Sequence, residues 1–175
     1  MSVGPRITGV LLILTATLVQ VSIISRIEVG DASPDLLILV VASLALLSGS
    51  VPGAAYGFLA GVTLATFAAL PLGPHALLGT LAGYAIGRVG EALVTDEHPA
   101  PPLLAGIFAT ILMHVGRPLV EFLVNPGSQV VNVWSHALVV TVISSVLAVP
   151  VYVLVRRLLI VSQDASGAIS EATTS

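Results

Sequence analysis

Two apolar stretches with glycine at every fourth residue constrain this chain more than any other feature. They lie within residues 50–91, and their glycines are Gly53, Gly57 and Gly61, followed by Gly79, Gly83 and Gly87. In an α-helix, a step of four residues advances about 40° beyond a full turn, so each series forms a shallow ridge without side chains. The connection Pro71-Leu72-Gly73-Pro74 is short enough to predict an antiparallel return. We therefore expect a helical hairpin whose two backbones approach closely.

The composition places this hairpin in a membrane. Hydrophobic residues make up 56% of the 175 residues and charged residues only 9%, against about 25% charged residues in an average soluble protein. Lipid tails are as apolar as leucine, so helices in a bilayer associate through close packing, which small residues promote. The predicted fold class is an all-α membrane protein, a bundle of six transmembrane helices.

Six apolar runs can cross the hydrocarbon layer, which is about 30 Å thick. They are residues 6–25, 34–49, 51–70, 73–94, 103–124 and 130–158. Together they define one polytopic membrane domain at residues 1–161, and the small polar residues that follow predict a disordered cytoplasmic tail at 162–175. The first run is longer than the apolar part of a secretory signal and lacks an A-x-A-type site, so we interpret it as a retained span.

The second run begins with a helix-start signal. Ser33 is a candidate N-cap, Pro34 suits the first helical position, and Asp35 places a carboxylate at the positive end of the helix dipole. The run is short for a transmembrane helix. This predicts either local thinning of the bilayer or a helix that its neighbours shelter.

The positions of the arginines predict the orientation. An even number of spans puts both termini on one side, and a cytoplasmic placement leaves Arg26 as an isolated basic residue in an outer loop. The residues that this placement puts inside are Arg6, Arg88, Arg156 and Arg157. Because basic residues favour the cytoplasmic side of a membrane, we expect a multi-pass protein of the inner membrane with both termini in the cytoplasm.

The sequence lacks the patterns of a catalytic, cofactor or metal site. It has no cysteine, and it contains no G-x-S-x-G, H-E-x-x-H or phosphate-binding loop motif. Its arginines are too scattered to bind nucleic acid. We interpret His75, His98 and His136 as packing or solvated residues, although His98 beside two acidic residues could also touch a metal. We predict no enzyme activity, no cofactor and no metal.

The fifth predicted span carries the most unusual polar cluster. His114, Arg117 and Glu121 are spaced i, i+3 and i+7 and share one helix face. An ionisable residue inside a span is a candidate for function, because burying its charge costs on the order of a few kcal/mol. In one interpretation, Arg117 extends to the headgroups and pairs with Glu121. In the other, the cluster contacts a partner protein or a lipid.

Four short motifs follow one another between residues 33 and 88. They are Pro34-Asp35-Leu36-Leu37, Gly57-Phe58-Leu59-Ala60-Gly61, Pro71-Leu72-Gly73-Pro74-His75-Ala76-Leu77 and Gly83-Tyr84-Ala85-Ile86-Gly87. Their order and spacing resemble those of the bacterial rod shape-determining protein MreD family. The residues that carry this resemblance are Pro34, Asp35, Phe58, Pro71, Gly73 and Tyr84. The family commonly has an aspartate where this chain has Ala65.

The resemblance implies a non-enzymatic scaffold of the cell-elongation machinery, surrounded by membrane lipids, that supports lateral peptidoglycan synthesis and regulates cell shape. It implies a direct partner of the MreC type, which has one membrane helix. Through that partner it implies links to the actin-like MreB, a SEDS glycosyltransferase and a penicillin-binding transpeptidase.

The resemblance also implies a fold similar to the S components of energy-coupling-factor transporters, which supplies an alternative function. A substrate-binding S component would hold a vitamin near the outer face, and such a pocket needs a few convergent polar groups. It would also dock its transporter through small residues on the first span, where this chain has Gly9 and Ala16 but no A-x-x-x-A pair.

Overall fold

The computed structural model describes residues 3–22, 35–69, 71–93, 104–105, 107–109, 111–112, 116, 144 and 146–163. Its labelled helices are α1 (Val3–Ser22), α2 (Leu36–Ser48), α3 (Ser50–Phe67) and α4 (Leu72–Leu93). A further helix covers Val146–Gln163, and the described residues between 104 and 116 are also helical. The prediction of an all-α fold is confirmed over these residues.

Length and composition single out two of the described helices as able to cross a membrane, Ser50–Phe67 and Val146–Gln163. The helical stretches Arg6–Ser22 and Leu36–Ser48 are apolar but shorter. The layout of six spans and the limits of the membrane domain stay predictions. Ser162 and Gln163, placed in the predicted tail, still belong to the last helix, and residues 164–175 lie outside the described residues.

Helix α2 lies at the centre of the described bundle. Its residues from Leu37 to Leu46 are all buried, and it contacts α1, α3 and α4. A helix of 13 residues is too short to cross a bilayer unaided. Of the two explanations for its length, the structure favours shelter by neighbouring helices.

Asp35, rather than Ser33, is the N-cap of α2. Its Oδ1 accepts a hydrogen bond from the backbone N–H of Ile38 at 3.3 Å. The backbone N–H of Leu36 donates to Oε1 of Gln20 on α1 at 2.9 Å, so a neighbouring helix satisfies a second amide of the first turn. The helix therefore begins after Asp35, whereas the sequence predicted a start at Pro34. Ser33 and Pro34 themselves lie outside the described residues.

A single residue, Gly49, links α2 to α3. Its φ of 92° lies in a region that glycine adopts without steric cost. The Gly49 N–H donates to the carbonyl of Ala45 at 2.9 Å, and the Gly49 carbonyl accepts from the N–H of Gly53, also at 2.9 Å. The chain can therefore end one helix and begin the next within one residue while its backbone groups stay paired.

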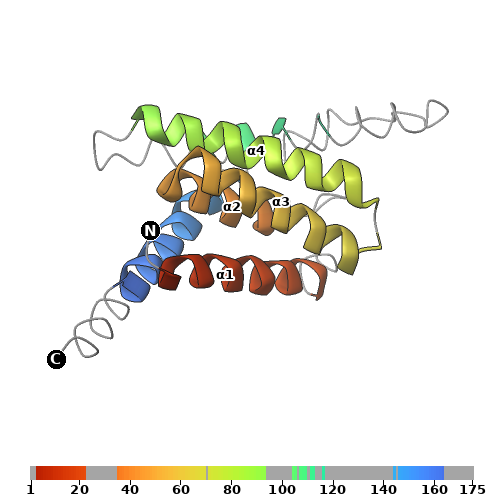
Figure 1. The fold of residues 1–175 in the computed structure, drawn as a ribbon, viewed down its shortest axis with the longest axis horizontal. Helices are drawn as coiled ribbons and strands as arrows, with labels where there is room; N and C mark the ends of the chain where they lie inside the picture. The colour runs from red at the N-terminus through yellow and green to blue at the C-terminus, as the bar shows by residue number, and fades with distance from the viewer. Residues whose placement is uncertain are drawn as a thin grey trace.

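Helices α3 and α4 run side by side in opposite directions and are joined by a short turn, with α1 beyond α3 (Figure 1). The Ala68 N–H closes the last turn of α3 by donating to the carbonyl of Leu64 at 2.8 Å, and Ala69 then takes a φ of 53°. Among the labelled helices, α1 contacts α2 and α3 but not α4. The hairpin of α3 and α4 thus has α2 and α1 packed against it.

Candidate functional site

The glycines of the hairpin face the backbone of the opposite helix. Gly53 lies against Gly83, Gly57 against Gly79, and Gly61 against His75. A Cβ added at Gly53 would lie 2.5 Å from the carbonyl oxygen of Gly83, closer than real Cβ contacts allow. The atoms in the way belong to helix backbone and cannot rotate aside, so only glycine fits at these positions.

Residues just before and just after these glycines point to opposite faces of the hairpin. The residue before each glycine is buried in five cases, namely Tyr56, Ala60, Leu78, Ala82 and Ile86. We call this the packed face, since Gly9 of α1 lies against Tyr56 and Gly116 lies against Leu78. The residue after each glycine is turned about 100° the other way round the ridge. The resulting aromatic face consists of Ala54, Phe58, Val62, Thr80, Tyr84 and Arg88.

One end of the hairpin is closed by a carboxylate. Oε1 of Glu91, in the last turn of α4, accepts from the backbone N–H of Ser50 at 2.7 Å and from the Ser50 hydroxyl at 2.8 Å. Its Oε2 accepts from Arg88 at 3.1 Å. The Ser50 N–H belongs to the first turn of α3, where no carbonyl of its own helix can pair with it. A side chain of α4 therefore caps α3.

The contact between Glu91 and Ser50 was not predicted from the sequence. Continuing the four-residue step from Gly87 reaches Glu91, and Gly87 lies against Gly49. That continuation places the carboxylate beside the start of α3, so the spacing alone could have indicated the cap once the antiparallel register was assumed.

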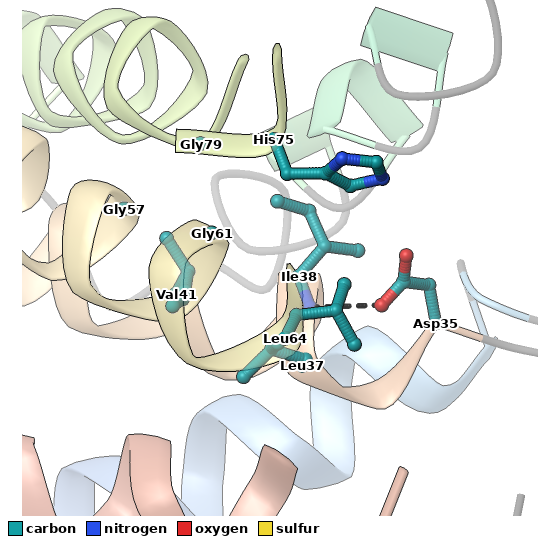
Figure 2. A pocket seen from close by; sticks show the side chains of 10 residues that line it. Asp35, Leu37, Ile38, Val41, Gly57, Gly61, Leu64, His75 and Gly79 are labelled. Atoms are coloured by element: carbon teal, nitrogen blue, oxygen red, sulfur yellow. Dashed lines mark hydrogen bonds between the residues drawn. The ribbon is translucent and has the colours of Figure 1, made fainter. Parts of the chain in front are cut away.

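A small cleft, with about 20 Å³ of free space, lies at the other end of the hairpin. Figure 2 shows its apolar lining, with Asp35 from the start of α2 and His75 from α4 on one side. Both polar groups already have partners: Asp35 caps α2, and Nδ1 of His75 lies 2.9 Å from the carbonyl oxygen of Pro71. The cleft therefore offers a ligand few polar contacts.

Helix α1 is joined to α3 by a polar contact inside the bundle. The hydroxyls of Thr17 and Thr63 lie 3.2 Å apart. Thr17 is fully buried, and each hydroxyl also lies within hydrogen-bond distance of a carbonyl one turn earlier in its own helix, so one hydroxyl can donate to its carbonyl while it accepts from the other threonine. No pattern in the sequence indicates this pair, because neither threonine belongs to a motif and the two residues lie 46 positions apart.

The remaining predicted site residues divide into two groups. Phe58 and Tyr84 are on the surface of the hairpin, with 53% and 48% of their area exposed, and Gly73 has nothing within 4 Å of an added Cβ. The cluster of the fifth predicted span lies outside the described residues, as do two of the histidines; these residues are His114, Arg117, Glu121, His98 and His136. Within the described part of the chain, no three His, Cys, Asp or Glu residues are grouped to hold a metal.

Comparison with known proteins gives one assignment. A family model described as rod shape-determining protein MreD matches residues 2–160. No curated protein matches the chain. The matched range includes every labelled helix and the glycine hairpin, and it extends well beyond the motifs that suggested the resemblance. The chain therefore belongs to the MreD family of rod shape-determining proteins.

Proposed function

We propose that this protein is a non-enzymatic scaffold of the cell-elongation machinery that binds an MreC-type protein in the bacterial inner membrane. Through that partner it would act together with MreB, a SEDS glycosyltransferase and a penicillin-binding transpeptidase in lateral peptidoglycan synthesis. The observation that carries the proposal is the family match over residues 2–160. It favours the scaffold over a vitamin-binding S component.

The hairpin suits a scaffold because its shape is set by backbone contacts. A platform that partners recognise must keep its surface when they bind, and side chains that can repack would weaken it. Here α3 and α4 meet through glycines, and Glu91 ties the end of one helix to the start of the other. This construction leaves little freedom for the two helices to slide or separate.

The polar groups of the described residues support a structural role. Asp35 and Glu91 accept hydrogen bonds from the first turns of α2 and α3, and His75 contacts a carbonyl of its own segment. A catalytic site needs a nucleophile with a base, or paired carboxylates, facing a reacting atom. These side chains instead hold helix ends.

The proposed topology has six spans and both termini in the cytoplasm. In that orientation the end of the hairpin with Arg88 and Glu91 faces the cytoplasm, as the distribution of basic residues favours, and the cleft at Asp35 faces outward. The cluster His114, Arg117 and Glu121 is a proposed contact for a partner or lipid. Arg117→Ala with normal abundance but less recovered partner would support that contact, whereas lower abundance with unchanged complex yield would refute it.

The proposal can be tested by co-expressing the tagged chain with the MreC-type protein of the same cell and purifying it in mild detergent. We expect the partner to co-purify, and we expect depletion of the chain to turn rods into spheres. A chain that purifies without this partner, from cells that stay rod-shaped after depletion, would overturn the proposal. A vitamin bound in stoichiometric amount would instead support the alternative function, a substrate-binding S component.

A further inference from the structure

We propose that the cleft beside Asp35 and His75 binds one water molecule, which donates one hydrogen bond to the Asp35 carboxylate and one to Nε2 of His75. The water joins the start of α2 to the first turn of α4, at the end of the hairpin opposite Glu91. The inference goes beyond the proposed function, because it assigns a ligand to the cleft whatever partner the protein binds.

The first observation is the size of the cleft. Its free space is about 20 Å³. A cavity can hold a water molecule once this space reaches about 10–15 Å³, provided that a few polar groups line it. Pockets for larger organic ligands occupy about 300–1,000 Å³. The cleft therefore has room for one water molecule, and it is too small for the vitamin that an S component would hold.

The second observation is the placement of two titratable groups. Asp35 and His75 are the titratable residues of the lining, and the other lining residues have apolar side chains or none. Figure 2 shows both groups on the same side of the cleft, with a carboxylate oxygen of Asp35 directed toward the ring of His75. Among the described residues, the ion pair joins Arg88 to Glu91 and not Asp35 to His75. The two groups therefore share the cleft without an ion-pair contact.

The third observation is which nitrogen of His75 carries the proton. Nδ1 lies 2.9 Å from the carbonyl oxygen of Pro71. A carbonyl oxygen only accepts hydrogen bonds, so Nδ1 is the donor and the neutral ring presents Nε2 as an acceptor. The Asp35 carboxylate is also an acceptor, with room for about four hydrogen bonds, of which the N–H of Ile38 takes one. Two acceptors that face one small space need a molecule with two donors between them, and water supplies both.

A side chain from elsewhere in the chain suits the cleft less well. Residues 23–34 precede Asp35 and contain one basic residue, Arg26. A guanidinium group has enough donors, but it is several times larger than a water molecule and exceeds the free space of about 20 Å³. A doubly protonated His75 could donate directly to Asp35 and would need no water. The experiments below separate both arrangements from the proposed one.

NMR of the full chain in detergent, with ¹⁵N-labelled histidine, tests the arrangement directly. The His75→Phe variant identifies the signals of His75 among those of the four histidines. At neutral pH we expect a ring protonated at Nδ1 alone, and a cross-peak from a bound water to the ring hydrogens beside Nε2. A doubly protonated ring, a proton on Nε2 alone or the lack of this cross-peak would overturn the inference.

A double-mutant cycle measures the link between the two helices. Asp35→Ser keeps an N-cap side chain but withdraws the carboxylate from the cleft, and His75→Phe keeps a ring without nitrogen. A bridging water is nearly as good as a direct hydrogen bond. We therefore expect the two substitutions to be coupled by about threefold in the unfolding equilibrium constant, the usual amount for one hydrogen bond between membrane helices. Asp35→Ser combined with Thr66→Val is the control, and its effects should be additive.

Arg26→Ala separates the two possible occupants of the cleft. We expect this substitution to leave both the water cross-peak and the coupling between Asp35 and His75 unchanged. If Arg26→Ala abolishes the coupling, a side chain fills the cleft and the inference is wrong. Additive effects of Asp35→Ser and His75→Phe would also overturn it. Either result leaves the proposed function standing, because recovery of the MreC-type partner tests that function separately.

Discussion

Gly57 and Gly79 face each other so closely that a Cβ added to either would overlap the carbonyl oxygen of the other. The relationship is reciprocal, and the same holds for Gly53 and Gly83. Along the contact, the backbone of each helix thus faces the backbone of the other. Dispersion and weak C–H···O contacts at this distance supply the attraction that a bilayer cannot.

Gly57→Ala should destabilise the protein by on the order of 1–3 kcal/mol, because the new methyl group would push the helices apart. Gly73→Ala is the control: its Cβ would meet open space, and alanine favours a helix over glycine by about 1 kcal/mol. Thermal unfolding in a fixed detergent measures both. If the unfolding temperature of Gly57→Ala equals or exceeds that of Gly73→Ala, the packing described for α3 and α4 is contradicted.

Glu91→Ala should lower the unfolding temperature, since the first amide of α3 loses its acceptor. Glu91→Gln retains an amide oxygen and should have a smaller effect. Arg88→Ala should lower the unfolding temperature least of the three, because the ion pair of Arg88 with Glu91 is exposed to solvent and exposed pairs contribute little to stability. Hydrogen exchange at the start of α3 reports the cap directly. Equal exchange in wild type and Glu91→Ala would mean that the carboxylate does not hold this helix end.

Asp35→Ala should cost about 1 kcal/mol of stability, the usual loss for an N-cap, and Asp35→Asn should stay close to wild type because asparagine caps equally well. Denaturant titration of the purified protein gives the two values. If the asparagine variant is as unstable as the alanine variant, the negative charge of Asp35 is needed and capping is not its role.

The Thr17–Thr63 contact should contribute about 0.6 kcal/mol, the mean for a hydrogen bond between membrane helices. A double-mutant cycle with Thr17→Val and Thr63→Val isolates this coupling. Thr66→Val serves as the reference, because its exposed hydroxyl bonds only to the carbonyl of Val62. Additive effects of the two substitutions would show that α1 and α3 are held by apolar packing alone.

The sequence predicted the features that depend on spacing along one helix. A four-residue glycine step determines which side of a helix can approach another backbone, and the short connection at Pro71 determines the direction of return. The same step explains why Ala65, one step after Gly61, is buried at 1% exposure and is small in this chain. The register between α3 and α4 also follows, once the turn length is known.

Features that join distant parts of the chain were not predictable. Helix α2 begins after Asp35 because the carboxylate of Asp35 caps Ile38, and the further contact from Leu36 to Gln20 on another helix is one that no local pattern encodes. The contact between the hydroxyls of Thr17 and Thr63 joins residues 46 positions apart, and the spacing within neither helix encodes it. The exposure of Tyr84 depends on which side of the hairpin the other helices pack against, which the spacing within α4 does not encode.

The most direct test of the account replaces one ridge glycine and one free glycine by the same bulky residue. Gly83→Leu and Gly73→Leu would be compared for unfolding temperature and for recovery of the MreC-type partner from the same membranes. We predict that Gly83→Leu loses both stability and partner, while Gly73→Leu keeps both. Wild-type stability and wild-type recovery of the partner in Gly83→Leu would show that the close approach of α3 and α4 is not the basis of the scaffold.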